Sequence, residues 1–255
     1  MKISTAKWIT LIAFVGVILL NALANALPIA GRTTGDVSEL YPNLFTPAGF
    51  AFSIWGVIYA GLLAYVIRVL TLKKGDELAI LRVTPWWVVN ALANMAWILS
   101  WHYLYLYTSL LLMLVLLYSL IRITSKLAQV SSTSRDLKLA RFVFDLYFGW
   151  ITVATVANVT AVLIGVDWKG FGIAPELWMS LILGVIVIIS VVTYIRSATV
   201  FYLVPVLWAL YGIYSKHVAG FGGEYTSVIR SVQLAFAVIV VAVIFRIGRK
   251  VLVSS

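Results

Sequence analysis

Three stretches of the chain place aromatic and carboxamide side chains three or four residues apart, which puts them on one face of a helix. Indole and phenol rings offer flat apolar surfaces with one polar group each, and asparagine both donates and accepts hydrogen bonds. These residue types suit non-covalent binding of a flat, amphipathic molecule. The three faces are Phe52, Trp55 and Tyr59; Asn90, Asn94, Trp97 and Trp101; and Tyr147, Trp150, Ala154 and Asn158.

The sequence assigns no catalytic residue and no metal-binding residue. It contains no cysteine, which excludes thiolate metal sites, cysteine nucleophiles and a disulfide scaffold. No phosphate-binding loop, zinc-protease motif or Ser-His-Asp order is visible. The two histidines, His102 and His217, are isolated in the sequence. Imidazole commonly ligates haem iron, but we interpret both rings as structural.

The elements that must position these faces are membrane-spanning helices. The chain is 63% hydrophobic and only 11% charged, whereas soluble domains average roughly 45–50% and about 25%. About 20 apolar residues are enough to cross the hydrocarbon core as a helix. We therefore predict an all-α membrane protein with about eight transmembrane helices. They cover residues 8–27, 47–70, 85–105, 108–123, 141–166, 176–195, 199–215 and 227–247.

The basic residues give an orientation to these helices. All but four of the 19 Lys and Arg residues fall on the side of the amino terminus, the exceptions being Arg32, Lys169, Lys216 and Arg230. Cytoplasmic loops carry such an excess. We therefore predict a multi-pass protein of the cell membrane with both termini in the cytoplasm. The net charge of +10 then reflects orientation and attraction to anionic lipids, not binding of nucleic acid.

The first apolar run also resembles a signal peptide, because Lys2 and Lys7 precede it and small residues at 24–26 follow. Its length of about 20 residues exceeds a usual signal-peptide core, so we predict a retained helix.

On helix 141–166, Asp145 is expected to pair with Arg141, one turn away.

A helical rise of about 1.5 Å per residue places Asn21, Trp55, Trp97 and Asn158 at a similar depth, roughly 9–14 Å below the outer helix ends. Buried asparagine on separate helices has two interpretations. The side chains either join helices as a packed polar core or line a ligand pocket. The residues alone leave both open.

At these same positions the chain resembles the TspO/MBR family, the tryptophan-rich sensory proteins related to the translocator protein. The resemblance lies in an aromatic-tryptophan-aromatic block at 45–59, an asparagine-aromatic block at 90–97 and a Tyr-x-x-Trp-x-x-x-Ala-x-x-x-Asn block at 147–158. It covers roughly residues 8–166. The sequence departs from the family pattern at Phe45, Ala48 and Leu146, where the family carries tryptophan or proline.

The resemblance implies a five-helix bundle over residues 1–166 with an internal pocket, and a loop at 28–45 that covers it. The pocket would accept planar hydrophobic molecules such as porphyrins, haem or sterols. Residues 167–255 would form a separate three-helix membrane extension. Carried over by position, and joined with the faces described above, the predicted ligand-binding residues are Pro47, Phe52, Trp55, Tyr59, Asn90, Asn94, Trp97, Trp150, Ala154 and Asn158.

We therefore expect a sensory or carrier protein for a planar hydrophobic ligand of the tetrapyrrole class (porphyrin or haem) or for sterol-like lipids. Its expected partners are membrane lipids and a hydrophobic small molecule, with a homodimer as a further candidate assembly. One alternative is a small-molecule transporter, for which Pro205 is the best candidate for a broken helix. The other is an enzyme that degrades porphyrins.

Overall fold

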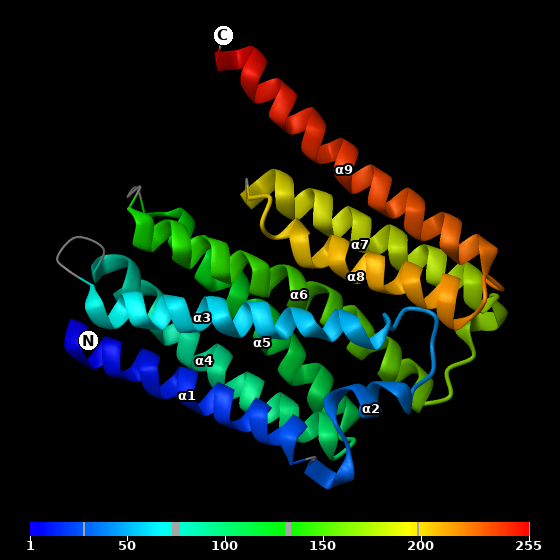
Figure 1. The fold of residues 1–255 in the computed structure, drawn as a ribbon, viewed down its shortest axis with the longest axis horizontal. Helices are drawn as coiled ribbons and strands as arrows, with labels where there is room; N and C mark the ends of the chain where they lie inside the picture. The colour runs from blue at the N-terminus through cyan, green and yellow to red at the C-terminus, as the bar shows by residue number, and fades with distance from the viewer. Residues whose placement is uncertain (28, 73–76, 131–133, 198, 255) are drawn as a thin grey trace.

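A computed structural model describes residues 1–27, 29–72, 77–130, 134–197 and 199–254. The described chain is helical, and no strand occurs in it. Eight long helices account for most of it, and a short helix α2 and one-turn elements lie in the connections (Figure 1). The long helices are α1 (Ile3–Ala26), α3 (Ile54–Thr71), α4 (Glu77–His102), α5 (Leu106–Ala128), α6 (Arg135–Gly165), α7 (Pro175–Ser197), α8 (Leu203–Ser215) and α9 (Thr226–Ser254).

Long helices occur at all eight predicted positions, which confirms the predicted all-helical fold, and most of them extend beyond at least one predicted end. The 3₁₀ turn η2 (Gly49–Ser53) leads into α3, and α2 (Thr34–Glu39) lies in the long connection before it. Six of the described helices are long and apolar enough to span a membrane by themselves. The other two, α4 and α8, pack between neighbours, which compensates for the polar residues of α4 and the 13-residue length of α8.

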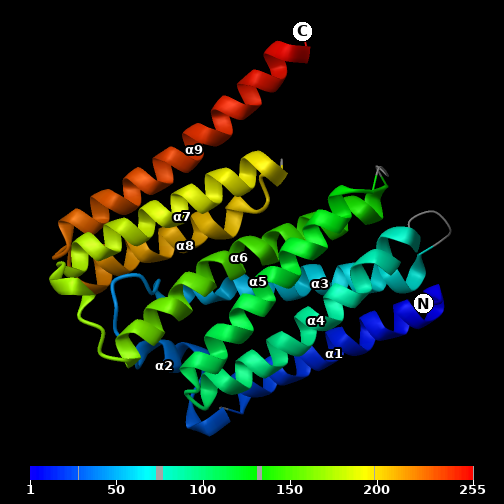
Figure 2. The ribbon, with the colours of Figure 1, turned by 180° about the vertical axis from the view of Figure 1, so that it is seen from behind.

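Helix α6 lies at the centre of the molecule. The helices α3 and α5 pack against it, with α1 and α4 completing a bundle on that side. On its other side α8 packs against α6, and α7 pairs with α9. Figures 1 and 2 show the long helices running alternately in opposite directions, so the chain begins and ends on the same side of the molecule. We call that side the terminal end.

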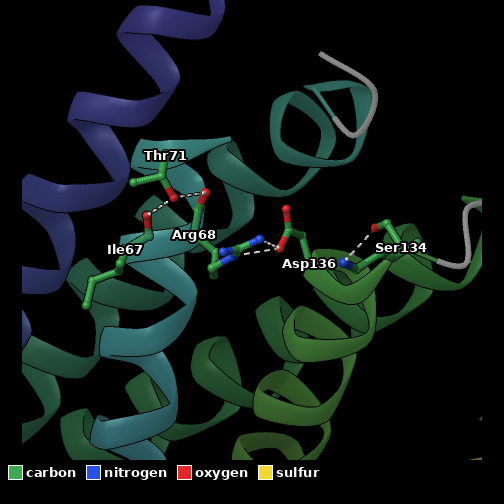
Figure 3. A network of polar contacts seen from close by, with 6 residues as sticks. Ile67, Arg68, Thr71, Ser134 and Asp136 are labelled. Carbon is green, nitrogen blue, oxygen red and sulfur yellow. Dashed lines mark hydrogen bonds and ion pairs between the residues drawn. The ribbon is translucent and has the colours of Figure 1, made fainter. Parts of the chain in front are cut away.

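At the terminal end, polar contacts fix the start of α6. Ser134 accepts a hydrogen bond from the backbone N–H of Leu137, which caps the helix. Arg68, in the last turn of α3, pairs with Asp136 at 2.6 Å (Figure 3). Because the pair is partly exposed, it contributes little free energy and mainly aligns α3 with α6. Lys73 and Lys74, which we counted for orientation, and Pro28, the start of the predicted covering loop, lie outside the described residues.

A close approach of backbones joins α6 to α8. A Cβ atom built on Gly149 would lie 2.0 Å from the carbonyl oxygen of Tyr202, just before α8. Only glycine leaves room for this contact. Pro205 packs on the same spot; it sits in the first turn of α8, where proline is tolerated, and not in the middle of a broken helix.

Candidate ligand-binding site

The aromatic faces meet at a cavity on the side of the molecule opposite the terminal end. Its volume, as space open to the centre of a water molecule, is about 50 Å³. Ligand pockets commonly measure about 300–1,000 Å³, so the cavity is narrow in this conformation. We call it the slot. It is lined by Thr34, Ser38, Thr46, Pro47, Phe52, Trp55, Trp97, Trp101, Met113, Trp150, Val153, Ala154, Ala157, Asn158 and Ala161.

Seven of the ten predicted site residues line the slot, and three do not. Those that line it are Pro47, Phe52, Trp55, Trp97, Trp150, Ala154 and Asn158. Tyr59 lies behind Trp55, with the two rings stacked at 5.4 Å. Asn90 and Asn94 are fully buried outside the lining. The structure therefore brings together residues from α3, α4 and α6, as expected, and sets two of the asparagines apart.

The aromatic residues of the slot form two groups. In one, the Trp150 ring meets the rings of Trp55 and Phe52 edge to face, with centroids 6.2 Å and 6.1 Å away. In the other, Trp97 and Trp101 stack one turn apart on α4, at 6.1 Å and 18°. Such geometries are favourable for aromatic pairs, and they hold the rings in fixed orientations. The slot thus presents flat apolar surfaces from three helices.

Two tryptophans of the slot wall, Trp97 and Trp150, carry an indole N–H group that is not hydrogen-bonded. In both, Nε1 is buried and has no partner among the described residues. By contrast, Nε1 of Trp101 donates to the backbone carbonyl of Thr34 at 3.2 Å. A buried donor without an acceptor costs about 1–3 kcal/mol. A ligand that brings an acceptor to these groups would recover that free energy.

The buried asparagines mostly satisfy one another and their neighbours. Nδ2 of Asn21 donates to Oδ1 of Asn94 at 2.7 Å, and Nδ2 of Asn94 donates to the Tyr147 hydroxyl at 3.0 Å. This chain of bonds joins α1, α4 and α6. Asn90 donates to the Ser119 hydroxyl at 2.8 Å. These residues therefore match the first interpretation, a packed polar core. Asn158 instead lines the slot, and its Oδ1 also accepts a hydrogen bond from the Ser109 hydroxyl.

The slot is covered by α2 and by the segment at 44–53, which we call the roof. Thr33 caps α2 by a reciprocal pair of bonds with Asp36, and these bonds hold the pKa of Asp36 below its ordinary value. Just before the roof, Oδ1 of Asn43 accepts from the backbone N–H groups of Phe45 and Thr46, which fixes the turn that carries Pro47.

The end of α8 and the π-helical turn η4 (Lys216–Gly220) hold the roof by its backbone. The Ala48 N–H donates to the Gly212 carbonyl at 3.1 Å, and Nε1 of Trp208 donates to the Ala51 carbonyl at 2.9 Å. Nζ of Lys216 donates to the Thr46 carbonyl at 3.1 Å. A Cβ atom on Gly212 would lie 2.8 Å from Cβ of Ala51, so the contact requires glycine.

His217 completes this attachment. Its Nε2 lies 2.9 Å from the Leu44 carbonyl oxygen, so Nε2 carries the proton. Its Nδ1 is buried and has no partner in the part of the chain that the structure describes. Burial lowers the pKa of His217, and the neighbouring Lys216 charge lowers it further, against the opposing effect of the Leu44 carbonyl. Burial also lowers the pKa of Lys216. The ring is therefore suited to a neutral, structural role.

Sequence reasoning did not find several lining residues. Trp101 continues a face that was recognised, and its spacing from Trp97 could have placed it in the site. Val153, Ala157 and Ala161 share the α6 face with Ala154, so helical spacing could have found them too. Thr34 and Ser38 lie on a short helix in a polar connection, and nothing in the sequence marks them. Among the described residues, no histidine lines the slot.

The chain was compared with known proteins. The model of the family described as TSPO-like protein matches residues 7–246. The match runs past residue 166 and includes α7, α8 and most of α9. No curated protein and no solved structure gives a significant match. The chain belongs to the TSPO-like family, as one of its long, multi-pass membrane members.

Proposed function

We propose that this protein binds a flat, largely apolar molecule with hydrogen-bond acceptors at its edge, of the porphyrin class, in the slot. The observation that carries the proposal is the pair of unpaired buried indole donors, Trp97 and Trp150, in the wall of an aromatic cavity. Membership of the family supports a role in membrane ligand binding or transport. Apolar burial and ring stacking supply most of the affinity, and the two donors fix the orientation of the ligand.

Binding requires the slot to widen. Only about 50 Å³ is open to the centre of a water molecule, which is enough for a few waters but not for a porphyrin. The roof is the part that can shift, because it is a connecting segment that hydrogen bonds, and not a continuous long helix, attach to α8 and η4. Ordering or displacement of such a segment is a common step in ligand binding.

A titration with mesoporphyrin, read as tryptophan quenching in lipid nanodiscs, tests the proposal. Ala154→Phe places a large ring inside the slot, whereas Ala60→Phe places the same ring on the exposed face of α3. We expect at least tenfold weaker binding for Ala154→Phe, about 1.4 kcal/mol or more, and little change for Ala60→Phe. Equal affinity in the two variants would place the ligand elsewhere. The truncations Trp55→Ala and Trp150→Ala are expected to reduce the quenching as well.

Transport is the weaker candidate. The slot shares no lining residue with the large cavity at the terminal end, so the two do not form one continuous path among the described residues. Pro205 does not break a helix near its middle. Proteoliposomes separate the two roles, since a binding protein takes up ligand only to the level of its sites, and net accumulation beyond that level would establish transport.

Degradation of porphyrin stays a separate prediction. To test it, the protein with bound porphyrin is incubated in the dark and under illumination, and the porphyrin products of the two samples are analysed. Porphyrin recovered intact in both conditions supports a binding protein.

A further inference from the structure

A second cavity, at the terminal end, differs in kind from the slot. It opens between α5 and α6 on one side and the α7–α8 connection on the other, where Figures 1 and 2 show the start of α6 standing apart from the end of α7. Its volume, as space open to the centre of a water molecule, is about 1160 Å³. We call it the crevice.

The lining of the crevice combines cations with apolar surface. Its basic residues are Lys138, Arg141 and Arg196, and its one acidic residue is Asp145. The rest are hydroxyl-bearing and apolar side chains, among them Leu127, Phe142, Thr199 and Phe201. Three positive charges against one negative charge leave an excess of positive charge beside an apolar wall.

The expected pair between Asp145 and Arg141 is not formed. The Arg141 guanidinium donates instead to the backbone carbonyls of Leu127 and Val130, at 2.9 and 2.7 Å, where it satisfies the end of α5. Asp145 accepts a hydrogen bond from Thr199 and is only 7% exposed. The last carbonyl groups of a helix have no partner within the helix, so they compete with the carboxylate for the guanidinium. This competition explains why Arg141 does not pair with Asp145.

Two of the basic groups remain available to a ligand. The side chains of Lys138 and Arg196 are exposed, and neither forms an ion pair in the described part of the chain. They come from different helices, α6 and α7, on the two sides of the crevice. The rings of Phe142 and Phe201 meet edge to face, with their centroids 4.8 Å apart, and form an apolar surface in the crevice. A ligand that satisfies this lining has an anionic head and apolar chains.

We propose that the crevice binds the phosphate headgroup of an anionic phospholipid, with the acyl chains along the apolar wall. The site lies near the ends of membrane-spanning helices, where headgroups are found. Basic pockets between transmembrane helices recognise such lipids. A free phosphate ester shares the headgroup chemistry, but it leaves Phe142, Phe201 and their apolar neighbours without a partner.

Competition between phosphatidylglycerol and phosphatidylcholine with identical chains tests the proposal, with bound lipid counted by native mass spectrometry. We expect the wild-type protein to prefer phosphatidylglycerol by about fivefold or more. The double variant Lys138→Gln with Arg196→Gln should reduce this preference to about twofold or less. The matched control, Arg82→Gln with Arg249→Gln, removes two exposed cations that do not line the crevice and should keep it.

The outcomes separate the possibilities. Equal loss in both double variants would show that the preference comes from overall charge, and it would overturn the site. Displacement of the lipid by glycerol 3-phosphate at similar concentrations would show a phosphate site without a lipid role and would also overturn the proposal. Retained preference in the crevice variant would exclude Lys138 and Arg196 as the binding groups.

Discussion

The two ends of α6 serve two cavities of opposite character. Toward its carboxyl end, Trp150, Ala154 and Asn158 line a narrow slot with aromatic walls and a covering roof. Toward its amino end, Lys138, Arg141 and Asp145 line a wide crevice that opens at the helix ends. One helix thus lines a narrow aromatic site at one end and a wide, charged one at the other. The carboxy-terminal helices contribute to both cavities, because the α7–α8 connection lines the crevice and the end of α8 holds the roof of the slot.

The largest expected effect comes from Gly149→Ala, which disrupts the contact between α6 and the start of α8. Both cavities depend on the position of these two helices. The added Cβ would lie 2.0 Å from the Tyr202 carbonyl oxygen, so α8 must move away from α6. We expect a loss of about 3 kcal/mol and a melting temperature lower by about 10 °C, with weaker binding at both cavities. Gly56→Ala on α3, where an added Cβ would meet no described atom within 4 Å beyond its chain neighbours and its own helix backbone, is the control in a thermal melt. A similar fall there would contradict the account.

Gly212→Val separates the two cavities. Its side chain would collide with Ala51 and Pro47 and push the roof off α8. Porphyrin binding should weaken about tenfold, with about 1–3 kcal/mol of stability lost, while the phospholipid preference of the crevice stays unchanged. Gly184→Val on α7, which meets nothing within 4 Å, should change neither. Loss of lipid preference in Gly212→Val would show that the two ends are coupled.

The unpaired donors give a sharper test within the slot. Trp97→Phe with Trp150→Phe removes both indole N–H groups and keeps aromatic rings. Mesoporphyrin, which carries carboxylates, should bind about tenfold more weakly, since hydrogen bonds to charged groups are worth about 1.5–3 kcal/mol. Etioporphyrin, which has none, should bind nearly as before in the same quenching assay. Equal losses for both porphyrins would assign the indoles to packing alone.

The smallest expected effect is a pH dependence at the roof. The pKa of His217 is lowered in the folded protein below its ordinary value of 6.5. Below about pH 6.5 the unfolded chain therefore binds more protons than the folded protein, so stability falls as the pH is lowered. We expect a melting temperature lower by about 2 °C at pH 5.5 than at pH 7.5. His217→Gln keeps a donor for Leu44 and should reduce this slope; an unchanged slope would exclude His217 as its source.

The sequence was sufficient for the helices and for seven of the fifteen residues that line the slot. A helix needs about 20 apolar residues to cross the hydrocarbon core, and the eight helices are recognised in the sequence as apolar runs of about this length. Helical spacing then assigns Trp55, Trp97 and Trp150 to shared faces. The same spacing could not decide between Asn158, which lines the slot, and Asn94, which bonds to Asn21 and Tyr147. That choice depends on the rotation of each helix against its neighbours.

The attachment of the roof could not be predicted. Trp208, Lys216 and His217 bind backbone carbonyls more than 150 residues earlier in the chain, and a carbonyl carries no signature in the sequence. The resemblance to short relatives also directed attention to residues 8–166, whereas the family match extends to residue 246. The division at residue 166 into two units stays a prediction, and the contacts between α8, α6 and the roof are its clearest test.

The most direct measurement is an experimental structure of the protein with mesoporphyrin bound in lipid nanodiscs. The account predicts ring density in contact with both aromatic groups of the slot, with a carboxylate near Nε1 of Trp97 or Trp150 and the roof displaced. Density on the lipid-facing surface, or in the crevice beside Lys138, with the slot unchanged, would contradict it.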